Sequence, residues 1–447
     1  MKSTKINVIQ FGTGNFLRGF IEPIFQNLKN KGLADPRICI VESTGSGKAK
    51  SMAKSKFEYP IWTTGMDKGE LINETLSIDC IAMGLSLPED GKGFLELAKN
   101  QDLEWVISNV TEAGFVLESE EDMTKFPKSF PARLTRFLFD RFEYFKGDPQ
   151  AGLQILPCEL VEENGKKLRG MILGQAKKWR LDQAFLDWIV QENNFYTTLV
   201  DRIVPGKPSQ KTLLKNDSTH LDHPFLVQAE PYFLLATQSD LSKELKLNIY
   251  ESDFPVLSVE SVQEYATRKV RVLNGSHIAM VVLGLPKGIE TVSEFMADDS
   301  LFSELKEMIE TEVLPYISQD QEELLDYSKA IWDRFRNPFV KHKLADISLN
   351  TITKLNPRII DSIISFYEAE GRIPRKLTGV LISALVNYLD SPERIRDTDQ
   401  VKAIFSEARK MKNPNEKADF LLSHSGLWNI DLRSFQGLKE ALLGKLS

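Results

Sequence analysis

Residues 6–20 have the sequence INVIQFGTGNFLRGF, and this stretch decides the fold. Its first part, INVIQF, is a short apolar run with β-branched residues, which predicts a buried strand. Gly12 and Gly14 follow at once, and apolar residues then recur three and four positions apart over residues 16–32, which predicts an amphipathic helix. A strand, a glycine turn and a helix form the opening unit of a dinucleotide-binding domain.

Three more apolar runs continue this pattern through the first half of the chain. They are RICIVE (37–42), LEWVISNV (103–110) and LQILPCEL (153–160), and helical spacing returns between them, as in residues 130–145. Strands that alternate with helices predict a parallel sheet that is covered on both faces.

The pattern changes near Ser258. Beyond it, long helical stretches dominate, as in residues 320–335 and 377–390. A chain of 447 residues also exceeds the usual size of a single hydrophobic core. The predicted fold class is therefore α/β, with a Rossmann-type NAD-binding domain over residues 1–258 and a mostly α-helical substrate and catalytic domain over residues 259–447.

Charge and composition limit the partners. The formal net charge is -7 and the chain has no long block of Lys or Arg, so no nucleic acid partner is predicted. No apolar run approaches the roughly 20 residues that span a bilayer, and the N-terminus does not resemble a signal peptide. Cys39, Cys80 and Cys158 are expected to be reduced core residues. The histidines show no metal-ligand spacing, so no metal is expected. The absence of a long apolar run and the reduced cysteines predict a cytoplasmic protein with no membrane partner.

Glu42 favours NAD as the cofactor. Gly12 would permit the tight turn and Gly14 would let the backbone approach the pyrophosphate, although Leu17 occupies the position of a third glycine. Glu42 ends the second predicted strand, where a carboxylate can accept hydrogen bonds from the adenosine ribose and repel the extra phosphate of NADP. The alternative is a plain turn with a solvated strand end; the position of these residues in the first two strands favours the nucleotide site.

Residues 269–277, KVRVLNGSH, carry the candidate chemistry. In an α-helix, with steps of about 100°, Lys269 would lie at 0°, His277 near 80° and Asn274 near 140°, on one broad face. Alcohol oxidation needs a base for the hydroxyl proton and donors for the developing negative charge, and a buried lysine can act as that base. A solvated helix start with a core histidine explains the spacing equally well.

The same residues resemble the K-x4-N-x2-H pattern of the polyol-specific long-chain dehydrogenases, the mannitol dehydrogenase family. GTGNFLRGF (12–20), SNVTEAGF (108–115) and LVDRIVPG (199–206) resemble further motifs of that family in the same order, so the resemblance spans essentially the whole chain. It implies that Lys269 is the general acid/base and that Asn274 and His277 polarise the substrate oxygen.

Further site residues follow from the resemblance. It implies that Glu112 assists proton transfer and that Asp201 lines the sugar site, although Asp201 could equally form a buried ion pair with Arg202. The implied cofactor-binding residues are Gly12, Gly14, Asn15, Phe16, Glu42 and Asn109.

Within the family, LPCELVEENGKKL (156–168) and RFRNPFVKHKLADISLNTITK (334–354) resemble the hexuronate-reducing members. The resemblance implies NADH-linked reduction of D-tagaturonate to D-altronate and the reverse. The mannitol dehydrogenases have an asparagine in the oxyanion site where this chain has Leu160, so either the remaining donors suffice or another group such as Asn164 takes part.

A small sugar acid is the only partner predicted, and the oligomeric state stays undetermined. Because the net charge is negative, a local basic side chain must hold the substrate carboxylate. Lys354 is the first candidate, with Lys341, His342 and Arg358 behind it; for Lys341 and Arg358 an ordinary solvated helix charge is favoured. A D-fructuronate reductase, a mannitol-type dehydrogenase and a non-catalytic nucleotide-binding sensor are the alternatives.

Overall fold

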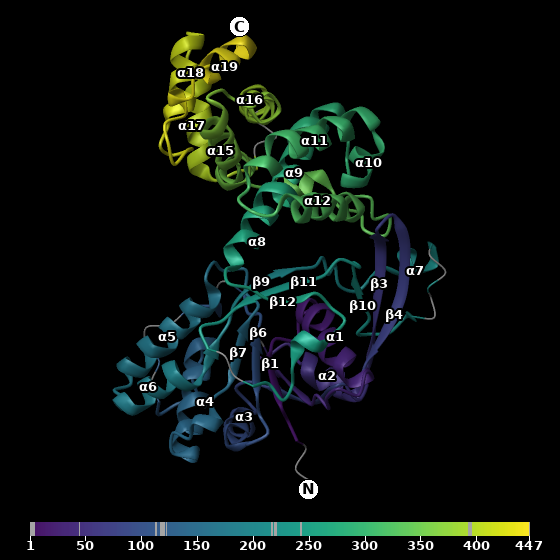
Figure 1. Ribbon diagram of the computed structural model, residues 1–447, viewed down its shortest axis with the longest axis vertical. Coiled ribbons are helices and arrows are strands. Elements are labelled where there is room, and N and C mark those ends of the chain that lie inside the picture. The colour runs from purple at the N-terminus through teal and green to yellow at the C-terminus, as the bar shows by residue number, and fades with distance from the viewer. Residues whose placement is uncertain are drawn as a thin grey trace. The chain divides into compact units, whose positions relative to one another are not determined.

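The computed structural model describes residues 5–43, 45–111, 114–116, 121, 123–215, 218, 221–241, 244–391 and 396–446 (Figure 1). The chain forms two compact units. The first unit contains Met1–Thr64 and Leu71–Val262, and the second contains Gly65–Glu70 and Gln263–Ser447.

The centre of the first unit is a six-stranded sheet with the strand order β5-β2-β1-β6-β7-β8. All neighbouring strands in it are parallel. The strands are β1 (Val8–Phe11), β2 (Ile38–Glu42), β5 (Ile81–Ser86), β6 (Trp105–Ser108), β7 (Gln154–Pro157) and β8 (Asn194–Phe195). The four predicted apolar runs supply β1, β2, β6 and β7, so the predicted parallel sheet is confirmed.

Helices cover both faces of this sheet (Figure 1). Because successive strand residues point to opposite faces, Val8 and Ile107 pack with α1 and α2, whereas Ile9 and Val106 pack with α3, α4, α5 and α6. The helices of the unit are α1 (Asn15–Asn30), α2 (Lys48–Lys54), α3 (Gly91–Glu96), α4 (Phe130–Phe145), α5 (Asn164–Lys178), α6 (Gln183–Glu192) and α7 (Gln210–Lys215). The three cysteines are buried and free, as predicted.

Two small sheets complete the first unit, and the apolar runs in the sequence predict neither of them. One has the order β10-β3-β4 and the other β12-β11-β9. Their strands are β3 (Tyr59–Asp67), β4 (Glu70–Ile78), β9 (Thr197–Asp201), β10 (Val227–Ala229), β11 (Leu234–Gln238) and β12 (Val256–Ser258). The turn between β3 and β4 groups with the second unit, where the Gly69 N–H donates a hydrogen bond to Asp333.

The second unit is helical, as predicted. Its helices are α8 (Val262–Arg268), the π-helix η6 (Lys269–Asn274), α9 (Gly275–Gly284), α10 (Val292–Ala297), α11 (Asp299–Glu312), α12 (Gln321–Phe335), α13 (Leu344–Ile347), α14 (Thr351–Leu355), the π-helix η9 (Asn356–Ile360), α15 (Asp361–Glu370), α16 (Arg375–Asp390), α17 (Asp399–Lys410), α18 (Pro414–Ser423) and α19 (Leu438–Leu446). Residues of α9 are buried on all sides, which identifies it as the central helix of this unit.

Within the described residues, no helix combines the length and the apolar character that crossing a membrane requires.

Candidate active site

The first candidate region is the turn between β1 and α1. Gly12 has a φ of +119°, which side chains rarely adopt, and its N–H donates to the Val41 carbonyl at 3.0 Å. A Cβ at Gly12 would also lie 3.2 Å from the Asn109 carbonyl oxygen. Backbone conformation and close approach therefore both require glycine here.

The N-terminus of α1 is open for an anionic ligand. Gly14 caps this 16-residue helix without a side-chain hydrogen bond, and the first turn contains no acidic residue. A Cβ at Gly14 would meet nothing within 4 Å, so a ligand can approach the backbone. Free N–H groups and the helix dipole at such an end favour a phosphate, so the turn fits the pyrophosphate of a dinucleotide.

The side chains of Asn15 and Phe16 are engaged with the protein itself. The Asn15 Oδ1 accepts a hydrogen bond from the buried Arg18 guanidinium at 2.5 Å. Phe16 stacks on Phe20 with 4.9 Å between the ring centroids. The cofactor contacts of Asn15 and Phe16 stay a prediction.

Glu42 lies at the end of β2, as predicted, but its carboxylate also starts α2. Oε1 accepts from the Ser46 hydroxyl at 2.6 Å and Oε2 accepts from the Ala49 N–H at 2.9 Å. Burial alone would raise the Glu42 pKa, but the hydrogen bonds from Ser46 and from backbone N–H groups outweigh it and lower the pKa. Oε2 also accepts from the Ser86 hydroxyl at 3.4 Å, and Glu42 is buried, so its contact with a ribose hydroxyl stays a prediction.

Lys48 is a charged neighbour of Glu42 that the sequence analysis did not single out. It is the first residue of α2, and burial together with the nearby Arg18 lowers its pKa to about 8, against the opposing effect of Glu22 and Glu42. The signal in the sequence was the lysine of GSGK, directly after the second strand.

Asn109 follows the end of β6 and lies against the glycine turn, where its carbonyl oxygen approaches Gly12. Its Nδ2 donates to the Cys158 carbonyl at 2.6 Å, and the following Val110 N–H donates to Glu159 at 3.0 Å. The side chain thus links the ends of two strands. Glu112 lies outside the described residues, and its role stays a prediction.

The structure decides the question raised at Leu160. Leu160 is 75% exposed, whereas Asn164 is fully buried. The Asn164 amide donates to the Glu159 carbonyl at 3.0 Å and to the Thr198 hydroxyl at 2.9 Å, and it accepts from the Thr198 N–H. Asn164 therefore links the end of β7 to the beginning of β9. Because its amide is buried and bonded to the protein itself, the structure argues against the suggestion that it replaces the oxyanion asparagine.

Asp201 is the last residue of β9 and is buried in the first unit. The neighbouring Arg202 donates to the backbone carbonyls of Glu230 and Gly19, at 2.9 and 2.8 Å. These bonds fasten the turn after β9 to α1. The role of Asp201 in a sugar site stays a prediction.

Lys269 and Asn274 lie on a π-helix, so their predicted angular positions are wrong. A π-helix bonds over five residues instead of four, and the Gly275 N–H accordingly donates to the Val270 carbonyl. The π-helix shifts Asn274 and His277 relative to Lys269 from the positions expected in an α-helix. Lys269 and Asn274 are half-buried. Among the described residues, none makes a hydrogen bond to the Asn274 amide.

His277 is buried in an aromatic cluster on α9. Its ring lies 4.8 Å from Phe335 and 5.0 Å, edge-on, from His342, measured between centroids. Burial lowers the pKa of His342, opposed by Asp346. Burial fits both the core-histidine alternative and a polarising role, so the role of His277 stays a prediction. No set of three or more His, Cys, Asp or Glu in the described part of the chain is arranged to hold a metal.

The basic candidates Lys354 and Arg358 lie in the same unit as Lys269. Both are half-buried, while Lys341 is exposed, as expected for a solvated charge. Lys354 Nζ donates to the Ile347 carbonyl at 3.4 Å. A Cβ at Gly275 would lie 2.9 Å from the Arg358 carbonyl oxygen, so the two π-helical segments pack directly against each other.

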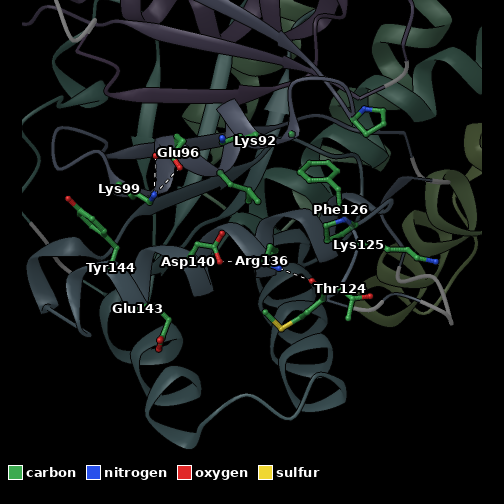
Figure 2. A pocket seen from close by; sticks show the side chains of 15 residues that line it. Lys92, Glu96, Lys99, Thr124, Lys125, Phe126, Arg136, Asp140, Glu143 and Tyr144 are labelled. Carbon is green, nitrogen blue, oxygen red and sulfur yellow. Dashed lines mark hydrogen bonds and ion pairs between the residues drawn. The ribbon is translucent and has the colours of Figure 1, made fainter.

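A separate cavity of about 740 Å³ lies between α3, α4 and residues 123–127 (Figure 2). None of the predicted site residues lines it. Figure 2 shows Lys99 paired with Glu96, at 2.9 Å, and Arg136 paired with Asp140, at 2.8 Å. Lys99 and Arg136 are therefore paired with carboxylates of the cavity wall itself.

The parallel sheet with a glycine turn after its first strand is typical of a Rossmann-type dinucleotide-binding domain. The helical unit carries Lys269, Asn274 and His277. The sequence matches the mannitol dehydrogenase Rossmann domain over residues 6–250 and the mannitol dehydrogenase C-terminal domain over residues 261–446. The chain belongs to the mannitol dehydrogenase family, and it is a polyol-type oxidoreductase.

Two curated relatives resemble the chain over nearly its full length. The altronate oxidoreductase of Bacillus subtilis (strain 168) is 33% identical, covering 97% of this chain and 90% of the relative. That of Escherichia coli O139:H28 (strain E24377A / ETEC) is 32% identical, covering 98% and 93%.

Two solved structures share the fold. A substrate-free D-sorbitol dehydrogenase has a TM-score of 0.80 at 19% identity, over 98% of this chain and 92% of the other. A Pseudomonas fluorescens mannitol 2-dehydrogenase, in ternary complex with NAD and D-mannitol, has a TM-score of 0.68 at 19% identity, over 99% and 91%.

Proposed function

We propose that the chain is an NAD-dependent tagaturonate reductase, also called altronate oxidoreductase, which interconverts D-tagaturonate and D-altronate in hexuronate catabolism. The similarity to altronate oxidoreductases over 97% of the chain carries the proposal. The open N-terminus of α1 and the charged Glu42 support NAD as the cofactor, because the first favours a pyrophosphate and the second repels the extra phosphate of NADP.

Lys269 is the proposed general acid/base. NAD, when bound, accepts the hydride from the carbinol carbon, and NADH returns it. In the oxidation, Lys269 Nζ removes the proton of the carbinol hydroxyl, and in the reduction it returns that proton to the same oxygen. Lys269 is half-buried, on the π-helix that also carries Asn274.

Asn274 and His277 are the proposed donors to the reacting oxygen. Since no described residue makes a hydrogen bond to the Asn274 amide, its N–H groups are available to a substrate. A donor placed where negative charge develops stabilises the transition state more than the ground state. Lys354 supplies positive charge for the substrate carboxylate.

Replacement of Lys269 tests this proposal. In Lys269→Ala we expect kcat with D-tagaturonate and NADH to fall by about 100-fold or more, because proton transfer loses its base. NADH binding, followed by the fluorescence of the coenzyme, should stay within about twofold of wild type, because the pyrophosphate turn lies in the other unit. A variant with full turnover would refute the role of Lys269, and wild-type protein inactive on D-tagaturonate would refute the proposed function.

A further inference from the structure

Arg358 is a half-buried cation without a partner. It lies on η9, and its guanidinium has no hydrogen bond and no ion pair within the part of the chain that the structure describes. Burial lowers the Arg358 pKa. A partly buried charge that lacks a partner is unfavourable unless a ligand supplies the opposite charge.

Two acidic residues could be expected to pair with Arg358: Asp361, which is close in sequence, and Asp397, which acts on the neighbouring Lys354. Burial raises the pKa of Asp361, three residues further on, and the nearby charge of Arg271 opposes that shift. Asp397 accepts hydrogen bonds from the Ile352 N–H, the Thr353 hydroxyl, the Tyr388 hydroxyl and the Thr398 N–H, at 2.6–3.1 Å. Neither carboxylate is left to neutralise Arg358.

Lys354 adds a second positive charge to the same place. Burial, and next to it the charge of Arg358, lowers the Lys354 pKa, opposed by Asp397. The two cations therefore repel each other within one half-buried site. A carboxylate bound between them would relieve that repulsion.

Packing places Arg358 beside the candidate chemistry. Its carbonyl oxygen lies 2.9 Å from the position of a Cβ on Gly275, and Gly275 stands between Asn274 and His277 in the chain. Only a glycine allows this approach. The backbone of Arg358 is thus fixed against the start of α9, the segment that carries the two proposed donors.

We infer that Arg358, with Lys354 beside it, binds the carboxylate of the sugar-acid substrate, and that Arg358 is the principal anchor. This inference rests on the proposed function. A guanidinium can hold a carboxylate through two parallel hydrogen bonds, which fix its orientation as well as its charge, whereas an ammonium acts as a point charge. The sequence favours Lys354 as the anchor, whereas the unpartnered guanidinium in the structure favours Arg358.

The test compares D-altronate with D-altritol, the polyol that has a hydroxymethyl group in place of the carboxylate. In Arg358→Met we expect KM for D-altronate to rise about 10- to 100-fold with NAD, while kcat/KM for D-altritol stays within about twofold. In Lys354→Met the KM for D-altronate should rise by a smaller factor than in Arg358→Met. Arg372→Met is the matched control, because Arg372 is exposed and follows α15 in the chain. This variant should leave the kinetic constants for both substrates unchanged.

Calorimetric titration of D-altronate into protein saturated with NADH measures binding without turnover. Weaker binding to Arg358→Met but not to Arg372→Met, with unchanged thermal unfolding, supports the anchor. The anchor would be overturned if Arg358→Met lost kcat/KM equally for D-altronate and D-altritol, or if it bound D-altronate as tightly as wild type. If wild-type protein binds D-altronate through Arg358 but does not oxidise it, the anchor stands and the proposed function fails.

Discussion

Gly12 combines a φ of +119° with a neighbouring carbonyl oxygen 3.2 Å from the position of any Cβ. In Gly12→Ala we expect NADH binding to weaken by about tenfold or more, because the turn must move away from Asn109 to relieve the strain. Gly170→Ala is the control, since a Cβ there meets nothing within 4 Å. Fluorescence titration with NADH measures both variants, and an unchanged dissociation constant for Gly12→Ala would contradict the assignment of the turn.

Glu159 is a buried carboxyl at the same edge of the sheet. Burial raises its pKa to about 6 from the ordinary 4.5, although the Val110 N–H opposes the shift. Since the folded pKa exceeds the unfolded pKa, stability from this group is fully present below pH 4.5 and is lost as pH rises to about 6.

Glu159→Gln removes this titration and keeps an acceptor for Val110. We therefore expect the variant to gain up to about 2 kcal/mol over wild type at pH 7 and little at pH 4.5. Urea unfolding across this pH range measures the difference. If the free energies of unfolding of the two proteins changed in parallel with pH, burial of ionised Glu159 would not destabilise the folded protein.

Single residues could be predicted where backbone geometry decides their role. Gly12 and Glu42 lie where the strand and turn pattern placed them. The engagement of Asn15 with Arg18, and of Asn164 with Thr198, depends on residues distant in sequence or on rotamers. Local spacing places Arg18 near Asn15 but does not give the rotamers that join them, and it holds no information about the pairing of Asn164 with Thr198.

At the scale of elements, the helix through Lys269 shows the limit of periodicity. The sequence predicted a helical segment here, but the π-helix η6 was not predicted. Its insertion moves Asn274 and His277 relative to Lys269. A second π-helix, η9, packs against it at Gly275, so the irregularity belongs to the pairing of two segments that lie far apart in the sequence.

Gly275→Ala tests the importance of this pairing. The added Cβ would lie 2.9 Å from the Arg358 carbonyl oxygen, so one segment must shift, at a cost of roughly 1–3 kcal/mol. We expect kcat/KM for D-altronate to fall about tenfold or more, because the proposed donors move relative to the anchor. Gly379→Ala on α16, where a Cβ meets nothing within 4 Å, should retain wild-type kinetics. Wild-type kinetics in Gly275→Ala would contradict the close packing.

At the scale of the whole molecule, the main sheet and the helical second unit were predictable, whereas the two small sheets were not. The strands of the parallel sheet are continuous apolar runs because they are buried on both faces. β4 is largely exposed and carries a mixed sequence, ELINETLSI, so its pairing depends on β3 and not on its own pattern. Non-local pairing of this kind leaves little trace in local periodicity.

One kinetic panel tests the proposed substrate and the proposed cofactor together. NADH oxidation is measured with D-tagaturonate, D-fructuronate and D-fructose, each repeated with NADPH, and kcat/KM is compared throughout. We predict that D-tagaturonate with NADH exceeds every other combination by at least about tenfold. A preference for D-fructose, or no turnover of any of the three sugars, would contradict the proposed substrate. Equal use of NADPH would contradict the proposed cofactor.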